Sequence, residues 1–259
     1  MKIIVCLKQV PDTRNVRLDP KTNTMSREGV ESIMNPYDRH ALEEGVSLAA
    51  QYGGTVTALS MGPPQAAEML KEAVACGADQ GVLISDRAFA GADTLATTYT
   101  LARAVLTLGT ADLIICGKQA IDGDTAQVGP GLARRLDLAY ASCISKIHEV
   151  RDDCLLARRM MDDGYDELEI TLPALLTVVR EINEPRIPSL KGKMKARKTV
   201  IKTFNAADIG ADTALLGLAG SPTRVARVFA PEARGERAML EGTVIEQVKE
   251  LAVRLEAII

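Results

Sequence analysis

Four times within its first 136 residues, the chain passes from a short continuous apolar run into a stretch with helical periodicity. The apolar runs cover residues 2–8, 55–61, 81–85 and 112–116, and the helical stretches cover 35–52, 65–76, 93–108 and 126–136. Buried parallel strands are apolar on both sides, because helices cover both faces of such a sheet. The repeat therefore predicts an α/β fold with an open, doubly wound, mostly parallel sheet and helices on both faces.

The first of these helices carries its own start and stop signals. Asn35 suits the N-cap, Pro36 suits the first helical position, and Asp38 suits the positive end of the helix dipole. Gly53 suits the end of the helix. Between the first strand and this helix, residues 16–28 are predicted to form a polar hairpin.

The pattern changes after about residue 140. Strands are predicted over 141–150, 154–160, 165–172 and 174–179, and 165–172 alternates as a half-exposed antiparallel strand does. A last helix begins at a capping box formed by Thr243 and Glu246. We expect an α/β domain over 1–183 with an antiparallel extension, followed by a C-terminal arm over 184–259 that packs on another subunit.

Composition disfavours several classes of function. The net charge is −3, so nothing global indicates nucleic acid or an anionic membrane. Only two His are present, which argues against a His-rich metal site and against most His-based catalysis. The five Cys have no CxxC spacing and are interpreted as buried thiols of a reducing compartment. The first apolar run is too short for a signal peptide, and no window approaches the roughly 20 apolar residues of a membrane span, so a cytoplasmic protein is expected.

The strongest local motif is the stretch from Gly117 to Pro130, which follows the fourth strand and opens a helix. Its small residues let backbone N–H groups approach an anion, and Thr125 and Gln127 add donors. It matches neither the P-loop nor the usual dinucleotide fingerprint. The residues alone leave two interpretations, a phosphate cradle or a helix that Asp124 caps after a Gly-rich turn.

A second strand-to-helix loop runs from Ser85 to Thr94 and contains Arg87 and Phe89. The positive helix start and Arg87 would suit a flavin ring or a second nucleotide. The alternative is a surface turn in which Phe89 is a packing residue.

A basic stretch over 186–202 has no aromatic residue, so base stacking is not indicated. It is either a solvated face or a protruding loop with an apolar tip that docks on an acidic partner. His40 and His148 are expected to be structural or exposed, and no set of residues indicates acid–base catalysis. A scaffold for a redox cofactor would account for that, because the cofactor carries the chemistry.

Taken in order, several motifs resemble the beta (small) subunit of electron transfer flavoproteins, over essentially the whole chain. They are VCLKQVPDT at 5–13, MNPYD at 34–38, MGP at 61–63, GKQAIDGDTAQVGP at 117–130, the region 159–178, NEPR at 183–186 and MKARK at 194–198. The resemblance implies an alpha subunit partner that carries an FAD and is embraced by the C-terminal arm. It also implies an adenine nucleotide in this subunit.

The residues expected at that nucleotide come from the matched motifs and from the loop 85–94. They are Cys6, Leu7, Asn35, Pro36, Tyr37, Asp38, Met61, Arg87, Phe89, Gly91, Ala92, Asp93, Thr94, Gly117, Asp122, Gly123, Asp124, Thr125, Ala126, Gln127, Val128, Gly129, Pro130 and Ala133. No metal site and no catalytic residue is expected.

The stretches SDRAFAGADTLAT at 85–97, GKMKARK at 192–198 and AGSPTRV at 219–225 resemble the electron-bifurcating members of that family. This favours FAD in this subunit over AMP. The implied reaction takes a hydride from NADH and sends one electron through the alpha subunit to an acyl-CoA dehydrogenase and the other to ferredoxin or flavodoxin. The residues expected to dock on the dehydrogenase are Ile187, Leu190, Lys193, Lys195 and Arg197.

Two other functions stay open. One is a non-bifurcating subunit whose AMP is structural. The other, of a different class, is an adenine-nucleotide hydrolase or an enzyme like an ATP pyrophosphatase. The number of flavins in the purified two-subunit complex would discriminate among the three.

Overall fold

The computed structural model of the chain describes residues 1–12, 17–18, 25–26, 31–226 and 239–257. The chain divides into two compact units. The larger unit comprises 1–17 and 26–226, and the second comprises 18–25 and 227–259. Residues 184–226, which we expected to belong to the arm, therefore lie within the larger unit. The packing of an arm on another subunit stays a prediction.

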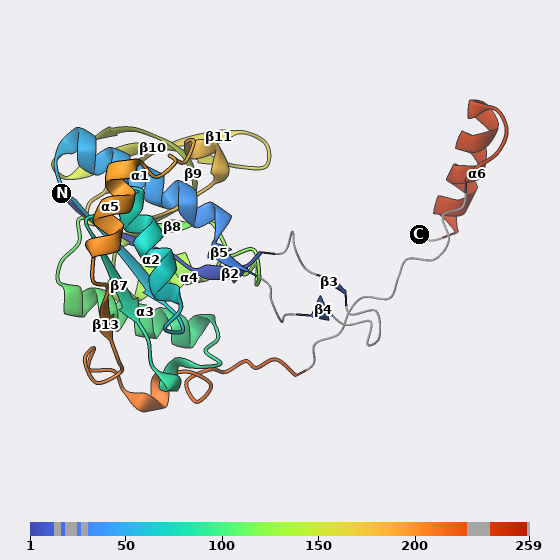
Figure 1. The fold of residues 1–259 in the computed structure, drawn as a ribbon. Coiled ribbons are helices and arrows are strands. Elements are labelled where there is room, and N and C mark those ends of the chain that lie inside the picture. The colour runs from blue at the N-terminus through green and yellow to red at the C-terminus, as the bar shows by residue number, and fades with distance from the viewer. Residues whose placement is uncertain (13–16, 19–24, 27–30, 227–238, 258–259) are drawn as a thin grey trace. The chain divides into compact units, whose positions relative to one another are not determined.

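The larger unit is built on a nine-stranded sheet (Figure 1). Its strands are β1 (Lys2–Cys6), β6 (Thr55–Met61), β7 (Gln80–Ile84), β8 (Leu113–Gly117), β9 (Ala139–Val150), β10 (Cys154–Met160), β11 (Tyr165–Thr171), β12 (Ala174–Val178) and β13 (Lys202–Phe204). Their order is β11-β10-β9-β12-β8-β1-β6-β7-β13. The neighbours from β9 to β13 pair in parallel, and β10 runs antiparallel to β9 and to β11.

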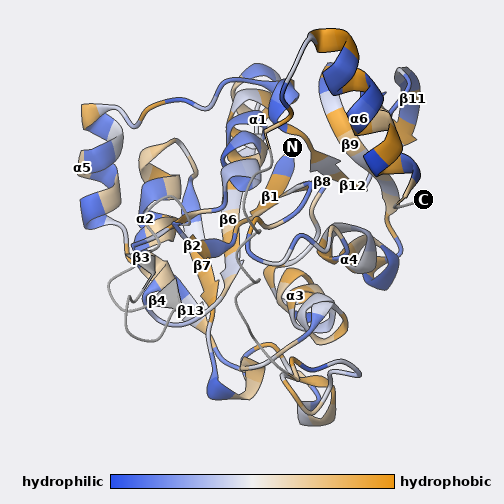
Figure 2. Cartoon of the chain, turned by 90° about the vertical axis from the view of Figure 1, so that its right-hand side faces the viewer, coloured by the Kyte–Doolittle hydropathy of each residue, from blue (hydrophilic) through white to orange (hydrophobic). Residues whose placement is uncertain are grey.

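Helices cover both faces of this sheet (Figure 2). They are α1 (Pro36–Tyr52), α2 (Ala66–Ala75), α3 (Thr94–Leu108), α4 (Val128–Leu136) and α5 (Leu190–Lys198). Side chains of α1, α2 and α5 share one core with Ile3 and Val5, and side chains of α3 and α4 share another with Ile4 and Cys6. Alternate residues of β1 thus enter different cores, which explains why the strand is apolar from Ile3 to Cys6. The predicted fold class is confirmed.

Several further elements of the described residues are short. The strands β2 (Gln9–Pro11) and β5 (Ser32–Met34) pair antiparallel, and β3 (Arg17–Leu18) pairs with β4 (Met25–Ser26). The 3-10 turns within the described ranges are η2 (Arg87–Phe89), η3 (Arg180–Ile182) and η4 (Thr213–Leu215). Of the hairpin predicted over 16–28, only β3 and β4 fall within the described residues.

Two elements of the basic stretch were not predicted from the sequence. One is β13, which adds a polar edge strand beside β7, and the other is α5, which has almost no apolar periodicity. α5 is held in place by its packing on α2 and not by a periodic pattern of apolar residues. A β-carbon at Gly192 would lie 2.1 Å from the Ala75 carbonyl oxygen, so α5 rests directly on the end of α2. Lys195 Nζ also donates to the Ala78 carbonyl oxygen at 3.0 Å.

In the second unit, α6 (Val244–Glu256) begins at the predicted capping box of Thr243 and Glu246, which is confirmed. An apolar stripe is exposed along the length of α6, at Val244, Val248, Leu251 and Leu255. An exposed apolar stripe on a helix is what an arm that binds a partner would present. No helix among the described residues is long and apolar enough to cross a membrane.

Candidate functional site

The chain changes direction across the sheet between β1 and β8. From β1 it proceeds through β6 and β7 on one side, and it then returns to β8 on the other side. Ligands of open α/β sheets bind at the carboxyl ends of the strands beside such a switch point. The loops that follow β1, β6, β7 and β8 are therefore the place to look for a site.

The first turn of α1 lies directly on the carboxyl end of β8. Asp38 is buried, and its carboxyl accepts hydrogen bonds from the N–H of Lys8 at 2.7 Å and from the N–H of Gly117 at 3.2 Å. Burial raises the pKa of Asp38 to about 7, although hydrogen bonds from Asn35, Lys8 and Gly117 and the charge of Lys8 oppose the rise. Asp38 lies in the first turn of α1, as predicted, and both of its oxygens also accept from backbone N–H groups at the ends of β1 and β8.

Asn35 occupies the predicted N-cap position of α1, but its side chain makes no cap hydrogen bond. Its Nδ2 donates to the Gln119 carbonyl oxygen at 2.9 Å, and its Oδ1 accepts from the N–H of Ile121 at 3.2 Å. Lys8 Nζ lies 2.7 Å from Asp122 Oδ1. The segment that follows β8 is thus fastened to α1 and to the end of β1. Lys8 was not among the predicted site residues, although it lies within the matched opening motif.

The Gly-rich stretch continues as an open loop before α4. Asp124 and Ala126 both have positive φ angles, of 48° and 53°, and this conformation delays the start of α4 to Val128. The Asp124 side chain accepts a hydrogen bond from Gln119 Nε2 at 2.8 Å and does not cap the helix, so the alternative interpretation of a helix capped by Asp124 is wrong. Gln127 is the N-cap and gives no side-chain cap.

The first turn of α4 consequently keeps free donors. Pro130 has no N–H, and the N–H of Gly131 donates to the Gln127 carbonyl oxygen, which leaves the N–H groups of Val128 and Gly129. Uncapped N–H groups at a helix start attract anions. Together with the exposed Thr125, they form a donor set that fits a phosphate or pyrophosphate. We call residues 122–130 the cradle.

The loop 85–94 adjoins the cradle. Thr94, the first residue of α3, donates from Oγ1 to Gln127 Oε1 at 2.9 Å. The two helices also pack closely further along, because a β-carbon at Gly131 would lie 2.8 Å from the Thr98 methyl group. The structure therefore brings together the two strand-to-helix loops that the sequence singled out separately.

Within the loop 85–94, the predicted site residues have different surroundings. Arg87 is exposed, and its guanidinium makes no ion pair with a described residue. Phe89 is buried in the core with α3, as the packing alternative expected. Gly91 has a φ of 74° and lies against Leu218, and Asp93 caps α3 by accepting from the N–H groups of Leu95 and Ala96.

The remaining predicted cofactor residues lie near the switch point. Cys6 and Leu7 are buried at the end of β1, and Met61 is half-buried at the end of β6. Cys6 is paired in register with Cys116 of β8, and the thiol of Cys6 together with burial raises the pKa of Cys116. Tyr37 packs under Arg180, whose guanidinium carbon lies 4.7 Å from the ring centre.

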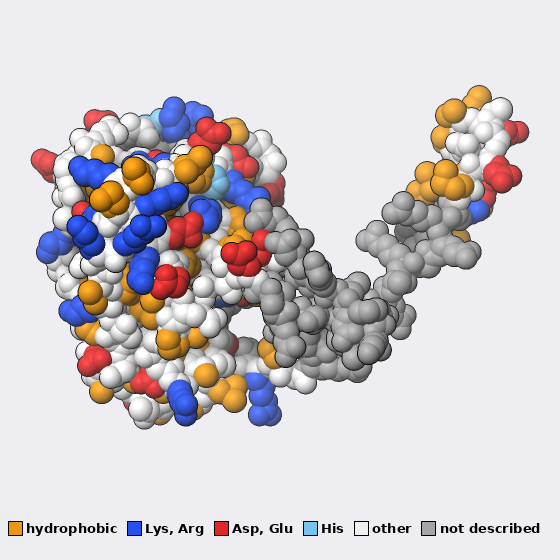
Figure 3. Space-filling view, in the orientation of Figure 1, with side chains coloured by type: hydrophobic (Ala, Val, Ile, Leu, Met, Phe, Trp, Pro, Cys, Tyr) orange, Lys and Arg blue, Asp and Glu red, His pale blue; other side chains and the backbone are white. Residues whose placement is uncertain are grey.

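The predicted docking residues lie apart from this site, on α5 and the segment before it. Figure 3 shows Lys and Arg side chains gathered around apolar ones over the region where Figure 1 places α5. Ile187 and Leu190 are 88 % and 77 % exposed. The segment is anchored by Arg186, which binds Glu43 through Nε and Nη2 at 2.7 and 2.8 Å and thereby lowers the pKa of Glu43 against the effect of its burial. The ammonium of Lys195 is turned inward to Ala78.

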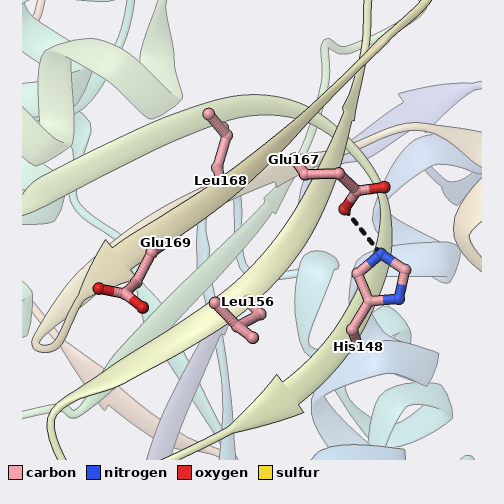
Figure 4. A pocket seen from close by; sticks show the side chains of 5 residues that line it. All are labelled: His148, Leu156, Glu167, Leu168 and Glu169. Carbon is pink, nitrogen blue, oxygen red and sulfur yellow. Dashed lines mark ion pairs between the residues drawn. The ribbon is translucent and has the colours of Figure 1, made fainter.

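A hollow of about 470 Å³ lies elsewhere, on the antiparallel extension (Figure 4). It is lined by His148, Leu156, Glu167, Leu168 and Glu169, and none of these is a predicted site residue. His148 Nε2 faces Glu167 Oε2 at 2.9 Å, and Glu167 also accepts from Arg158. This is a surface ion-pair network, and His40 likewise has a structural partner in Asn183. Among the described residues, no three His, Cys, Asp or Glu side chains gather as metal ligands.

Comparison with known proteins places the chain among flavoprotein subunits. Residues 22–209 match the family model described as the electron transfer flavoprotein domain. The chain is 48 % identical over 249 residues to the caffeyl-CoA reductase-Etf complex subunit CarD of Acetobacterium woodii, covering 96 % of this chain and 95 % of the relative. It is 46 % identical over 258 residues to the electron transfer flavoprotein subunit beta of Thermoanaerobacterium thermosaccharolyticum (99 % and 98 %) and 47 % identical over 247 residues to protein FixA of Bradyrhizobium diazoefficiens (93 % and 86 %).

Proposed function

The chain belongs to the electron transfer flavoprotein family, as its beta subunit, and we propose that it binds FAD and takes part in flavin-based electron bifurcation. Family membership gives it a role in electron transfer and an alpha subunit as partner. In the proposal, the two subunits take electrons from NADH and deliver them to an acyl-CoA dehydrogenase and to a low-potential acceptor, ferredoxin or flavodoxin.

The observation that carries FAD over AMP is the hydrogen bond between Thr94 and Gln127. It joins the start of α3 to the cradle, so that the loop 85–94 continues the border of the candidate site. Arg87 belongs to that loop and has no ion-pair partner among the described residues. A dinucleotide with a flavin ring would use the added length, whereas AMP would leave it without a role.

The residues present fit the group. When bound, FAD supplies the exchange of one or two electrons. The N–H groups of Val128 and Gly129 would hold its pyrophosphate at the start of α4. Arg87 would place positive charge beside the ring system and so favour its reduced, negatively charged form.

The acyl-CoA dehydrogenase partner is supported by two observations. The relative from Acetobacterium woodii is named as a subunit of a caffeyl-CoA reductase-Etf complex. In this chain, Leu190 is exposed among Lys and Arg side chains at the start of α5, a helix of the larger unit. An apolar anchor with a basic rim suits an acidic docking surface. A cytoplasmic location stays a prediction.

The test is the cofactor content of the purified complex of this chain with its alpha subunit. Absorption spectra and chromatography of the released nucleotides would count flavin and AMP per heterodimer. Two FAD are expected. One FAD with one AMP would establish the alternative of a non-bifurcating subunit. Flavin-free protein that hydrolyses nucleotides would establish the hydrolase. No observation of the fold favours the hydrolase.

The role of Arg87 is tested separately. Arg87→Ala should keep the flavin but slow NADH oxidation and lower the flavin potential, because a positive charge beside the reduced ring is lost. Arg151→Ala, on the turn between β9 and β10, is the matched control and should leave both unchanged. Unchanged flavin content, potential and NADH oxidation in Arg87→Ala would show that Arg87 has no such role.

A further inference from the structure

Asp38 joins the two strands that flank the switch point. Its Oδ2 accepts from the N–H of Lys8, just beyond the end of β1, and its Oδ1 accepts from the N–H of Gly117, the last residue of β8. Asp38 is 6 % exposed. β1 and β8 are paired in register up to Cys6 and Cys116, and the side chain of Asp38 binds the backbone of both strands just past that ladder.

The contact between α1 and β8 is as close as a backbone allows. A β-carbon at Gly117 would lie 2.4 Å from Asp38 Oδ1 and 2.6 Å from the Tyr37 β-carbon. Only glycine permits the first turn of α1 to rest there. The hydrogen bond from Gly117 to Asp38 therefore belongs to a tightly fitted contact and not to a loose surface turn.

Further bonds extend this contact into the segment that leads to the cradle. Asn35 binds Gln119 and Ile121 by their backbone groups, and Lys8 binds Asp122, the first residue of the cradle. The fastened residues of this segment are Gly117, Gln119, Ile121 and Asp122. Every residue from Gly117 to Asp122 therefore lies within two sequence positions of a residue that is bound to α1 or to the end of β1. A shift of Asp38 would be passed to the cradle through this segment.

We propose that Asp38 is a positioning residue, which acts through the backbone of Lys8 and Gly117 to hold the segment 117–122, and with it the cradle, in the geometry that binds the adenosine phosphate part of the cofactor. The inference rests on the proposed nucleotide site, but it does not depend on whether the nucleotide is FAD or AMP. It changes the role expected for Asp38 from a direct contact to an indirect one.

The charge of Asp38 offers a readout that a merely structural role would not give. Two titratable groups face Asp38, the ammonium of Lys8 beyond β1 and the thiol of Cys116 on β8. The thiol of Cys116 is itself hydrogen-bonded to the thiol of Cys6. Burial raises the pKa of Asp38 to about 7. Above that pH the carboxylate accepts charge-assisted hydrogen bonds from the N–H groups of Lys8 and Gly117, and below it the neutral acid resembles an asparagine.

The experiment uses the complex with the alpha subunit, freed of nucleotide and titrated with AMP and, in parallel, with FAD. Asp38→Asn should weaken binding about tenfold or more at about pH 8.5, and the ratio to wild type should fall toward one at about pH 5.5. Titration of the AMP phosphate cancels in this ratio. Asp112→Asn is the matched control, because Asp112 accepts from the N–H of Lys2 and so joins the same two strands at their opposite ends.

A second variant keeps the test informative if Asp38→Asn folds poorly. Lys8→Met changes a half-exposed side chain and removes a charge that lowers the pKa of Asp38. The pH at which nucleotide affinity changes through the titration of Asp38 should therefore be higher in Lys8→Met than in the wild type. A loss of affinity that is equal at all pH values, or equal in Asp112→Asn, would overturn the inference. Wild-type complex that binds AMP but not FAD contradicts only the proposed cofactor, and complex that binds neither overturns both.

Discussion

Thr223 donates two hydrogen bonds to the same carboxylate oxygen of Asp93, from its N–H at 3.1 Å and from its hydroxyl at 2.9 Å. The other oxygen of Asp93 caps α3, and the N–H of Asp93 donates to Ser221 Oγ at 2.8 Å. The last described residues before 227 are therefore fastened to the start of α3, beside the candidate site. This relationship fixes the path of residues 221–223 over the larger unit.

Removing the Thr223 hydroxyl should loosen that path without unfolding the sheet. Thr223→Val is expected to cost about 1 kcal/mol, and Asp93→Ala, which also removes a helix cap, about 2 kcal/mol. Urea unfolding measures both. Amide hydrogen exchange over 217–226 should quicken in Thr223→Val, while Thr213→Val, on an exposed 3-10 turn, should leave that exchange unchanged.

The stability of the chain should depend on pH through Asp38. Its pKa is raised from 3.8 to about 7 in the folded chain, so between these values the folded state holds a proton that the unfolded state has lost. The contribution of Asp38 to stability therefore falls as the pH rises from about 4 to about 7, by up to about 1.4 kcal/mol per pH unit, and is constant above.

The measurement compares urea unfolding of wild type and Asp38→Asn across this window. Other carboxyl groups, such as Glu43 with its lowered pKa, cancel in the difference between the two proteins. The difference should decline steadily up to about pH 7. A difference that is flat with pH would mean that Asp38 keeps its usual pKa in the fold.

The close approach of α1 to β8 predicts that Gly117 tolerates no side chain. Gly117→Ala would put a methyl group 2.4 Å from Asp38 Oδ1 and 2.8 Å from the Tyr37 carbonyl carbon, and we expect a loss of about 2–3 kcal/mol. Gly164→Ala has nothing within 4 Å of the added carbon and serves as the control, with a change within about 0.5 kcal/mol. Equal stability of the two variants would show that α1 can shift away from β8.

The exposed Leu190 should matter for a partner and not for the fold. Leu190→Ala is expected to slow electron delivery to an acyl-CoA dehydrogenase at least about fivefold without releasing flavin, since buried apolar anchors dominate interface energies. Leu106→Ala, an exposed leucine near the end of α3, is the matched control. Equal rates for wild type and Leu190→Ala in a reconstituted assay would remove Leu190 from the docking surface.

The sequence pattern predicted the bounds of an element correctly where the residue types reflect burial on both faces of the sheet or the start and end of a helix. The strand 55–61 and the ends of α1 at Pro36 and Tyr52 are found where they were predicted. It failed for α5, because its stability comes from the fit of Gly192 on Ala75, which no spacing along the chain reveals. It failed also for the start of α4, where the positive φ angles of Asp124 and Ala126 lengthen the loop.

The motifs themselves were visible in the sequence, but the tasks of their residues were not. Asn35 and Asp38 looked like signals for the start of a helix, because that is the role such residues play when only neighbours in the chain are considered. In the fold, both reach residues 79 or more positions away. The sequence by itself determined the α/β repeat and the two loops at the carboxyl edge of the sheet. Only the tertiary structure decided that α1 binds the ends of β1 and β8 together, since the order of strands in the sheet brings those two ends side by side.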